Sequence, residues 1–279
     1  MPHDCTGTMR TPIKLSYFLV FIRKFSFPKK LGILEKLYGT SLAKLGTQWV
    51  KCWNGVIWKL NLGDSCHRWI VYGKYEGGNG LEFAKNALQN GGVFVDSGAN
   101  IGQWLLYLAH QEGVKTFAFE PVFSQRDWLE ECLKVQNNWD VKVIEYGLAA
   151  KQEHLKIQCD GPRSTLNTNW YQDKKLSTET IEVVRLDQIL SEYAVSEVTF
   201  WKLDVEGAEL GALQGAEAFL KNKSIKIIYF ECHPDNYSAV TSFLKGYGYK
   251  ISYLLNNGEL CLMQSKCLTQ TQDLIATIG

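Results

Sequence analysis

Carboxylates follow four strand-like runs of this sequence, and the first of them opens a glycine turn. Asp96 ends the apolar run 93–95 and precedes the turn 98–102, which reads Gly-Ala-Asn-Ile-Gly and leads into a helix-like segment. Glycine takes left-handed backbone angles without strain and lets a ligand approach the main chain closely. A strand, such a turn and a helix in succession are typical of a loop that binds a nucleotide-type cofactor.

The charge of this loop indicates which cofactor it holds. A dinucleotide loop reads Gly-x-Gly-x-x-Gly and presents its helix N-terminus to a pyrophosphate. Here Asn100 interrupts the glycine spacing, and Asp96 would repel a pyrophosphate. S-adenosylmethionine has a sulfonium, an amino group and no phosphate. Glu120 ends the next strand-like run, where an acid binds ribose hydroxyls in doubly wound folds. The sequence therefore predicts an S-adenosylmethionine site, against the alternative of a glycine-rich turn beside a surface acid.

Two later blocks supply candidate catalytic groups. Asp204 and Glu206 follow one strand-like run, and Glu231 and His233 follow the next. Because the carboxyl ends of neighbouring parallel strands meet at one edge of a sheet, we expect these four side chains to converge. Methyl transfer to a hydroxyl also requires a base for the hydroxyl proton. His233 is the base candidate, with Asp204 or Glu231 either orienting it or acting as the base.

Other roles for these residues stay open. Asp204, Glu231 and His233 could instead ligate a divalent cation, although a metal-free site is favoured. His233 precedes a proline and also fits an ordinary turn. Glu209 is best explained as an acid at the positive end of a helix dipole, and Lys202 as a structural ion-pair partner.

The elements that must position these groups alternate along the chain from residue 93. Strands are predicted near 93–96, 115–119, 141–145, 198–203 and 225–230. Helices are predicted near 103–112, 124–137, 187–193, 207–221 and 236–245. Such alternation predicts an α/β fold with a parallel sheet that has helices on both faces.

The end of the chain and one insertion modify this pattern. The runs 249–255 and 259–264 flank Asn-Asn-Gly and predict a hairpin that adds antiparallel strands to the sheet. Parallel strands with such a hairpin are typical of the class I methyltransferase (Rossmann-like) variant of the doubly wound sheet. The insertion 146–185 contains two further predicted strands, 154–158 and 179–185. Long insertions of this kind often wall a site.

An extension precedes the cofactor loop. It begins with a predicted helix at 13–25, and continues with a hairpin around Asn54-Gly55 and a third strand at 68–72. Basic residues flank the helix, so contact with anionic lipid is an alternative to packing against the domain, which is the favoured role. The predicted organisation is a helical and β-hairpin extension over 1–78, a methyltransferase domain over 79–265 and a C-terminal tail over 266–279.

Bulk properties exclude several protein classes. The net charge of +1 across 279 residues offers no broad field for nucleic acid. The eight cysteines form no Cys-x-x-Cys pair, which favours reduced thiols and a cytoplasmic location over a disulfide framework. No apolar run approaches the roughly 20 residues that a membrane-spanning helix needs.

Three blocks together resemble a known family. Asp-Ser-Gly-Ala-Asn-Ile-Gly (96–102), Phe-Glu-Pro (119–121) and Lys-Leu-Asp-Val-Glu-Gly-Ala-Glu (202–209) resemble the FkbM-type methyltransferases in order and spacing, over about residues 70–255. The block 202–209 is the most specific, and Ser97 departs mildly from the aliphatic residue common there. The resemblance implies S-adenosylmethionine-dependent O-methylation. The cofactor residues it indicates are Asp96, Gly98, Ala99, Asn100, Gly102, Glu120, Pro121 and Asp204, with Glu145 and Tyr146 as looser matches on the adenine side.

The predicted function is thus an O-methyltransferase for a hydroxyl of a glycan, glycolipid or secondary metabolite. The alternatives are a NAD-dependent oxidoreductase and a methyltransferase-like interaction protein without catalysis. The predicted partner is a small-molecule or glycan acceptor, with no nucleic acid.

Overall fold

The computed structural model describes residues 11–74, 78–159, 164–165, 176–264 and 267–279. The chain divides into two compact units. The N-terminal unit contains residues 1–76 and 128–138, and the main unit contains residues 77–127 and 139–279. Among the described residues, no helix is long and apolar enough to cross a membrane.

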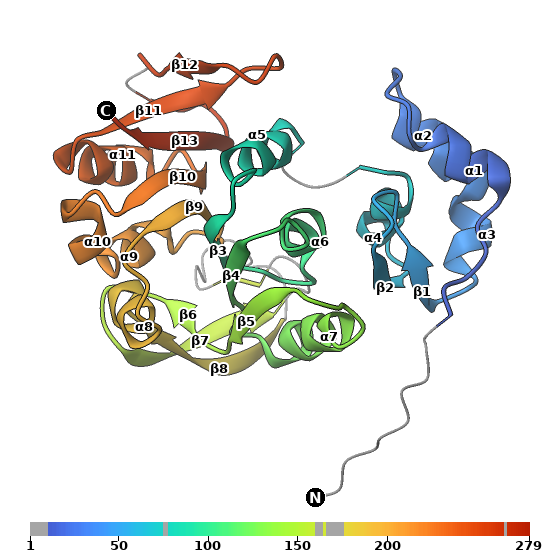
Figure 1. The fold of residues 1–279 in the computed structure, drawn as a ribbon, viewed down its shortest axis with the longest axis horizontal. Helices are drawn as coiled ribbons and strands as arrows, with labels where there is room; N and C mark the ends of the chain where they lie inside the picture. The colour runs from blue at the N-terminus through green and yellow to red at the C-terminus, as the bar shows by residue number, and fades with distance from the viewer. Residues whose placement is uncertain (1–10, 75–77, 160–163, 166–175, 265–266) are drawn as a thin grey trace, which may run out of the picture. The chain divides into compact units, whose positions relative to one another are not determined.

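The main unit is built on an eight-stranded sheet with the order β12-β11-β13-β10-β9-β3-β4-β5 (Figure 1). Its five parallel strands are β3 (Gly92–Ser97), β4 (Val114–Phe119), β5 (Asp140–Ile144), β9 (Val198–Leu203) and β10 (Ile225–Cys232). All five predicted strands are therefore confirmed. The strand order reverses between β3 and β9, and ligands of doubly wound sheets bind at such a switch point.

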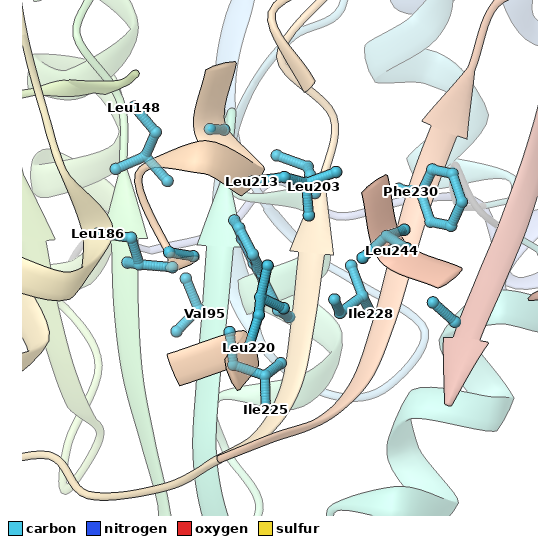
Figure 2. Packing of buried hydrophobic residues seen from close by; sticks show 14 of the residues in the cluster. Val95, Leu148, Leu186, Leu203, Leu213, Leu220, Ile225, Ile228, Phe230 and Leu244 are labelled. Carbon is cyan, nitrogen blue, oxygen red and sulfur yellow. The ribbon is translucent and has the colours of Figure 1, made fainter. Parts of the chain in front are cut away.

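Helices cover both faces of this sheet. They are α5 (Asn79–Ala87), α6 (Gln103–Leu108), α7 (Phe123–Leu133), α8 (Leu186–Glu192), α9 (Glu209–Gln214), α10 (Glu217–Lys221) and α11 (Tyr237–Gly246). On one face, buried side chains of α8 to α11 pack against alternate residues of the strands, including Val95, Ile228 and Phe230 (Figure 2). On the other, Trp104 of α6 stacks on Phe200 at a ring separation of 6.1 Å.

One predicted helix is two in the structure. The segment predicted at 207–221 forms α9 and α10, which meet at Gly215. A Cβ at this glycine would lie 2.3 Å from the carbonyl oxygen of Ala149, so the chain passes too close for another residue. The carboxylate of Asp187 accepts the N–H groups of Ala218 and Phe219 at 3.1 and 3.3 Å. It caps the start of α10 from a neighbouring helix, which sequence periodicity does not show.

The C-terminal strands confirm one prediction and correct another. The predicted hairpin is present as β11 (Tyr249–Leu254) and β12 (Leu260–Leu262), which pair antiparallel. The predicted tail 266–279 is wrong for its second half, because β13 (Gln272–Ile278) lies inside the sheet between β10 and β11. Leu274, Ile275 and Ala276 are buried there, and this burial stabilises a strand that short-range turn signals do not mark.

The insertion after β5 forms a separate three-stranded sheet. Its strands are β6 (Gly147–Leu148), β7 (Glu153–Cys159) and β8 (Ser177–Val184), in the order β6-β8-β7. Both strands predicted in the insertion are confirmed. Ile157, Ile181 and Val183 build a small apolar core with Val122.

The N-terminal unit combines short helices with a hairpin. Its elements are α1 (Tyr17–Ile22), α2 (Lys30–Leu34), the π-helix η1 (Glu35–Gly39), α3 (Thr40–Ala43), β1 (Thr47–Lys51), β2 (Ile57–Asn61) and α4 (Ser65–Val71). The β1–β2 hairpin is confirmed. The strand predicted at 68–72 is wrong, because Asp64 caps a helix there by accepting the N–H of Cys66 at 2.7 Å.

Candidate active site

The glycine loop lies at the carboxyl end of β3 and is held by backbone bonds. The N–H groups of Gly98 and Ala99 both donate to the carbonyl of Phe119, at 3.1 and 3.0 Å. Gly98 has a φ of +77°, and a Cβ there would lie 2.0 Å from the carbonyl oxygen of Asp204. Only glycine therefore lets this loop meet the acidic block that follows β9. Gly102, with a φ of +82°, starts α6.

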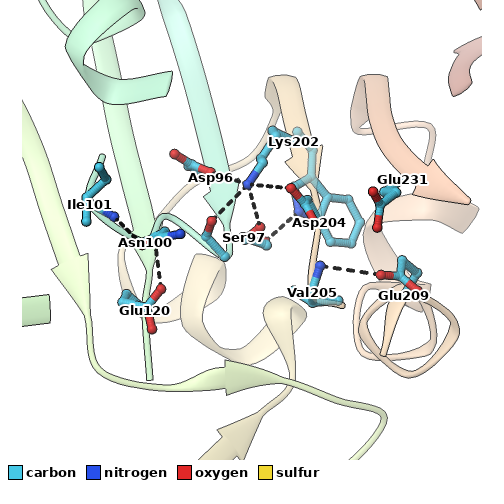
Figure 3. A network of polar contacts seen from close by, with 12 residues as sticks. Asp96, Ser97, Asn100, Ile101, Glu120, Lys202, Asp204, Val205, Glu209 and Glu231 are labelled. Carbon is cyan, nitrogen blue, oxygen red and sulfur yellow. Dashed lines mark hydrogen bonds and ion pairs between the residues drawn. The ribbon is translucent and has the colours of Figure 1, made fainter. Parts of the chain in front are cut away.

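Glu120 fastens the same loop from the end of β4. One carboxylate oxygen accepts the N–H of Asn100 at 2.8 Å (Figure 3). The other accepts the N–H of Val122 at 2.9 Å. Glu120 is 5 % exposed, and this burial raises the pKa of its carboxyl to about 7. Each carboxylate oxygen has a second lone pair. Glu120 can therefore still accept hydrogen bonds from the ribose hydroxyls, which is the role that the sequence predicts for it.

Lys202 lies at the centre of the site and joins both acidic regions (Figure 3). Its ammonium is 3.5 Å from a carboxylate oxygen of Asp96 and 3.4 Å from one of Asp204, and it donates to the carbonyl of Gly98 at 2.8 Å. The lysine side chain is 6 % exposed and that of Asp96 is 1 % exposed. Buried charges of this kind persist only when they are paired. The ion-pair role predicted for Lys202 is present.

Asp96 therefore supports the glycine loop from its buried side, where it pairs with Lys202. Its carboxylate is fully buried beside Lys202 and does not offer an exposed oxygen at the end of β3. A direct contact of Asp96 with the cofactor stays a prediction. Asp204 differs, because its side chain is 28 % exposed and reaches the surface of the site.

The acidic block after β9 is a turn held by Glu209. One carboxylate oxygen of Glu209 accepts the N–H of Gly207 at 3.0 Å and that of Val205 at 3.4 Å. The other accepts the side-chain amide of Asn236 at 2.9 Å. Glu209 starts α9, as the helix-dipole explanation requires, but it is fully buried and serves mainly to hold this turn. Glu206 lies in the turn with a φ of +51°, a strained angle for a residue other than glycine.

Glu231, His233 and Thr271 form a hydrogen-bonded chain at the end of β10. The Nε2 atom of His233 is 2.8 Å from a carboxylate oxygen of Glu231, and its Nδ1 atom is 2.9 Å from the hydroxyl of Thr271. The backbone N–H of His233 donates to the side chain of Asn236. These contacts join His233 to Glu231 and Thr271, and its role as a base stays a prediction.

Strand register brings the acids of three strands to one level. Lys202 pairs with Tyr229 in β10, and Glu231, two residues further on, pairs with Asp273 in β13. Burial, followed by the carboxylates of Asp204 and Asp273, raises the pKa of Glu231 to about 8. Glu231 therefore binds a proton more tightly than an ordinary glutamate, and it loses that proton close to physiological pH.

The structure brings predicted catalytic residues together at one edge of the sheet. Asp204, Glu231 and His233 lie at the carboxyl ends of β9 and β10 as predicted. Among the described residues, no group of three His, Cys, Asp or Glu side chains is placed to hold a metal ion. A divalent-cation role for Asp204, Glu231 and His233 stays an alternative. Glu206 contributes its backbone carbonyl, which accepts the hydroxyl of Thr165 at 2.6 Å.

Two of the remaining predicted cofactor residues, Pro121 and Glu145, contact Arg126. Its guanidinium donates to the carbonyl of Pro121 at 3.2 Å and pairs with Glu145 at 3.5 Å. The side chain of Glu145 is 62 % exposed, whereas Tyr146 is half-buried against the hydrophobic core. Among the described residues, no hydrogen bond or ion pair joins either residue to the glycine loop, and their adenine-side role stays a prediction.

Sequence reasoning missed three residues of the site. Asn236 links His233 to Glu209, Thr271 holds the far nitrogen of His233, and Asp273 faces Glu231. Thr271 and Asp273 lie in the segment 266–279, which the sequence predicts to be a tail. The apolar run 274–276 in that segment was a signal for a strand.

The chemistry of the site fits S-adenosylmethionine. Asp96 and Asp204 lie beside the glycine loop, and Lys202 is already paired with both of them. Such surroundings suit a ligand with a sulfonium and an ammonium group and disfavour one with phosphates. Glu120 and the loop 98–102 would hold this ligand, and Asp204 offers the exposed carboxylate at its edge.

Comparison with solved structures returns methyltransferases with low similarity. A putative rRNA methylase from Clostridium thermocellum matches at 16 % identity, covering 74 % of this chain and 97 % of its own, with a TM-score of 0.43. An S-adenosylmethionine-dependent O-methyltransferase from Thermotoga maritima matches at 12 % identity, covering 74 % and 66 % of the two chains, with a TM-score of 0.39.

Sequence comparison is more specific. The chain is 28 % identical over 143 residues to Methyltransferase 1 of Beauveria bassiana, a match that covers 44 % of this chain and spans 57 % of that relative. The model of the methyltransferase FkbM domain matches residues 96–251, from the carboxylate before the glycine loop to β11. This range contains the loop, Glu120, the acidic block and Glu231. The chain belongs to the FkbM family of methyltransferase domains, and that membership implies S-adenosylmethionine as the methyl donor.

Proposed function

We propose that this protein is an S-adenosylmethionine-dependent O-methyltransferase whose acceptor is a hydroxyl of a glycan, a glycolipid or a secondary metabolite. The observation that carries the choice of a hydroxyl is the Glu231–His233–Thr271 chain beside Asp204. Family membership supports methyl transfer and argues against the NAD-dependent alternative.

The chemistry of a hydroxyl acceptor explains why a base belongs here. S-adenosylmethionine, when bound, supplies an electrophilic methyl group on a sulfonium. A hydroxyl is a weak nucleophile until its proton leaves, so a group with a pKa near the working pH is required. Burial and neighbouring acids raise the pKa of Glu231 to about 8, which meets this requirement. Glu231 accepts the proton, and His233 shares it through their 2.8 Å contact.

Asp204 has a different part in the proposed reaction. Its carboxylate is held by Lys202 and remains partly exposed between the glycine loop and Glu231. It orients the acceptor hydroxyl toward the methyl group, a contribution of geometry that accounts for much of the rate in displacement reactions. Asp204→Asn should therefore keep cofactor affinity and lower turnover.

Methyl transfer from donor carrying a 13C-labelled methyl group tests the proposal. The purified protein is incubated with cell extracts and with a panel of hydroxylated glycans, glycolipids and metabolites, with and without EDTA. Carbon NMR of the product distinguishes an O-methyl from an N-methyl or S-methyl group. A labelled O-methyl product supports the proposal, whereas labelling of only amines or thiols overturns it. Binding of the donor without any transfer would favour the interaction-protein alternative.

A further inference from the structure

We infer that the N-terminal unit binds the surface of an anionic lipid bilayer through an aromatic and lysine-rich face. The face is formed by the exposed side chains of α1, α2 and η1. This inference goes beyond the proposed function and does not depend on the acceptor chemistry. It rests on exposed apolar side chains, on the charge of the segment that carries them and on a basic depression beside them.

The first observation is the distribution of exposed apolar side chains. Tyr17, Phe18 and Phe21 of α1 are 96 %, 56 % and 59 % exposed, and Phe25 just after the helix is 49 % exposed. Ile33 and Leu37 continue the series on α2 and η1. Of the twelve exposed large hydrophobic residues in the described parts of the chain, eight lie between residues 17 and 53. Apolar surface gathered in this way marks an interaction site.

The opposite side of α1 shows that this exposure belongs to a folded helix. Leu19 is 1 % exposed, and the guanidinium of Arg23 donates to the carbonyls of Lys51 and Cys52 at 3.1 and 3.2 Å. The helix is thus anchored to the β1–β2 hairpin by one side, as the packing prediction requires. Because α1 is apolar on all sides, this anchoring leaves the side chains of Tyr17, Phe18 and Phe21 exposed on its other side.

The second observation is charge, and it decides the kind of partner. Residues 11–45 carry seven basic residues and one acid, a net charge of +6 in a chain whose total is +1. The acid, Glu35, is paired with Arg68. Lys14, Lys24 and Lys29 are exposed near the aromatic residues. Aromatic side chains bordered by lysines fit the interface of an anionic bilayer, where rings enter the headgroup layer and ammonium groups meet lipid phosphates.

The third observation is a depression of about 510 Å³ next to this face. Lys24, Lys29, Lys30 and Lys74 line it together with Trp53, and none of its described lining residues is acidic. A site of this composition attracts a phosphate-bearing headgroup. A soluble protein partner would instead be expected to meet a mixed surface, since protein interfaces are depleted in lysine.

Vesicle flotation tests the inference with the full-length protein. Vesicles of phosphatidylcholine alone are compared with vesicles that contain phosphatidylserine. We expect binding to the anionic vesicles only, and binding that weakens as salt is added. Phe18→Ser with Phe21→Ser should lower the bound fraction at least about tenfold. Lys24→Gln with Lys29→Gln should lower the partition coefficient by about fivefold for each charge removed.

Matched controls distinguish binding through this face from nonspecific hydrophobic binding to vesicles. Leu260→Ser with Leu262→Ser removes two exposed apolar side chains from β12 of the main unit and should leave vesicle binding unchanged. Circular dichroism of every variant checks that the fold is kept. Equal binding to neutral vesicles, unchanged binding of the Phe18 and Phe21 variant, or binding of inorganic phosphate without vesicle binding each overturns the inference. So does a dimer in size-exclusion chromatography that the same aromatic substitutions dissociate.

Discussion

The two halves of the site are assembled in different ways. On the cofactor side, the glycine loop and Glu120 come from β3 and β4, which are neighbours in sequence and in the sheet. Backbone N–H groups of the loop donate to the carbonyl of Phe119 and to the carboxylate of Glu120. On the acceptor side, Glu231 depends on Thr271 and Asp273 from the end of the chain, and the connections run through side chains. The cofactor side is a local construction, and the acceptor side exists only in the folded sheet.

Lys202 is the point at which the two halves meet. It pairs with Asp96 behind the loop and with Asp204 at the acceptor edge. We therefore expect loop variants to change donor affinity, and variants at Glu231 to change turnover and its pH dependence. Lys202 variants should change both donor affinity and turnover.

The largest effect is expected at Gly98. In Gly98→Ala the new Cβ would meet the carbonyl of Asp204 at 2.0 Å in a left-handed conformation, so the loop must move. We expect a loss of at least about 4 kcal/mol in the free energy of unfolding, and no measurable donor binding. Isothermal titration and urea unfolding measure these two quantities.

Gly258→Ala is the matched control for Gly98. Its φ is +85°, but no atom lies within 4 Å of the added Cβ. It should cost only the conformational penalty of about 1–2 kcal/mol and leave donor affinity unchanged. Equal effects in the two variants would show that the close approach at Gly98 is unimportant.

Lys202→Met should affect both halves of the site. The substitution leaves the buried carboxylate of Asp96 without its cation, which costs about 3–5 kcal/mol of stability. Donor affinity and turnover should both fall. The control is Lys226→Met, which breaks the surface pair with Glu197 at the opposite edge of the sheet and should cost less than about 1 kcal/mol. If Lys202→Met is as stable as Lys226→Met, Lys202 does not hold the two halves of the site together.

Glu231→Gln should act on turnover alone. We expect turnover to fall by about 100-fold or more while the donor dissociation constant is unchanged. In the wild type, the pKa of Glu231 is raised to about 8, so its basic form, and with it the rate, should increase as pH rises through 8. That limb should disappear from the pH–rate profile of the variant. If the rate of Glu231→Gln still rises as pH passes through 8, another residue is the base. Glu197→Gln, a substitution at the surface, is the control.

The same shift predicts how stability depends on pH. A carboxyl whose pKa is raised in the folded state binds its proton more tightly there than in the unfolded chain. Its contribution to stability is complete below about pH 4.5 and is lost as pH rises toward 8. Glu231→Gln should therefore flatten the decline of the free energy of unfolding between these pH values, as measured by urea unfolding.

The smallest effect is expected at Thr271. At neutral pH Glu231 is protonated, so its carboxyl donates a hydrogen bond to Nε2 of His233. The Nδ1–H group of His233 then donates to the hydroxyl of Thr271. Thr271→Val removes one hydrogen bond, worth about 1 kcal/mol. Turnover should fall several-fold, and the rise of the rate near pH 8 should move to lower pH. Thr271→Ser should restore both. A limb at unchanged pH in Thr271→Val would leave the residue with a purely structural role.

The sequence by itself determined the alternating strands and helices, the glycine loop, and the acids at the ends of β3, β4, β9 and β10. These features depend on short-range patterns: hydrophobic runs, turn residues and a carboxylate at a strand end. Only the tertiary structure decided that Asp96 is buried beside Lys202, that β13 enters the sheet, and that Asn236, Thr271 and Asp273 complete the acceptor side. Burial and strand order depend on which distant segments pair, and pairing is the property that local sequence patterns do not contain.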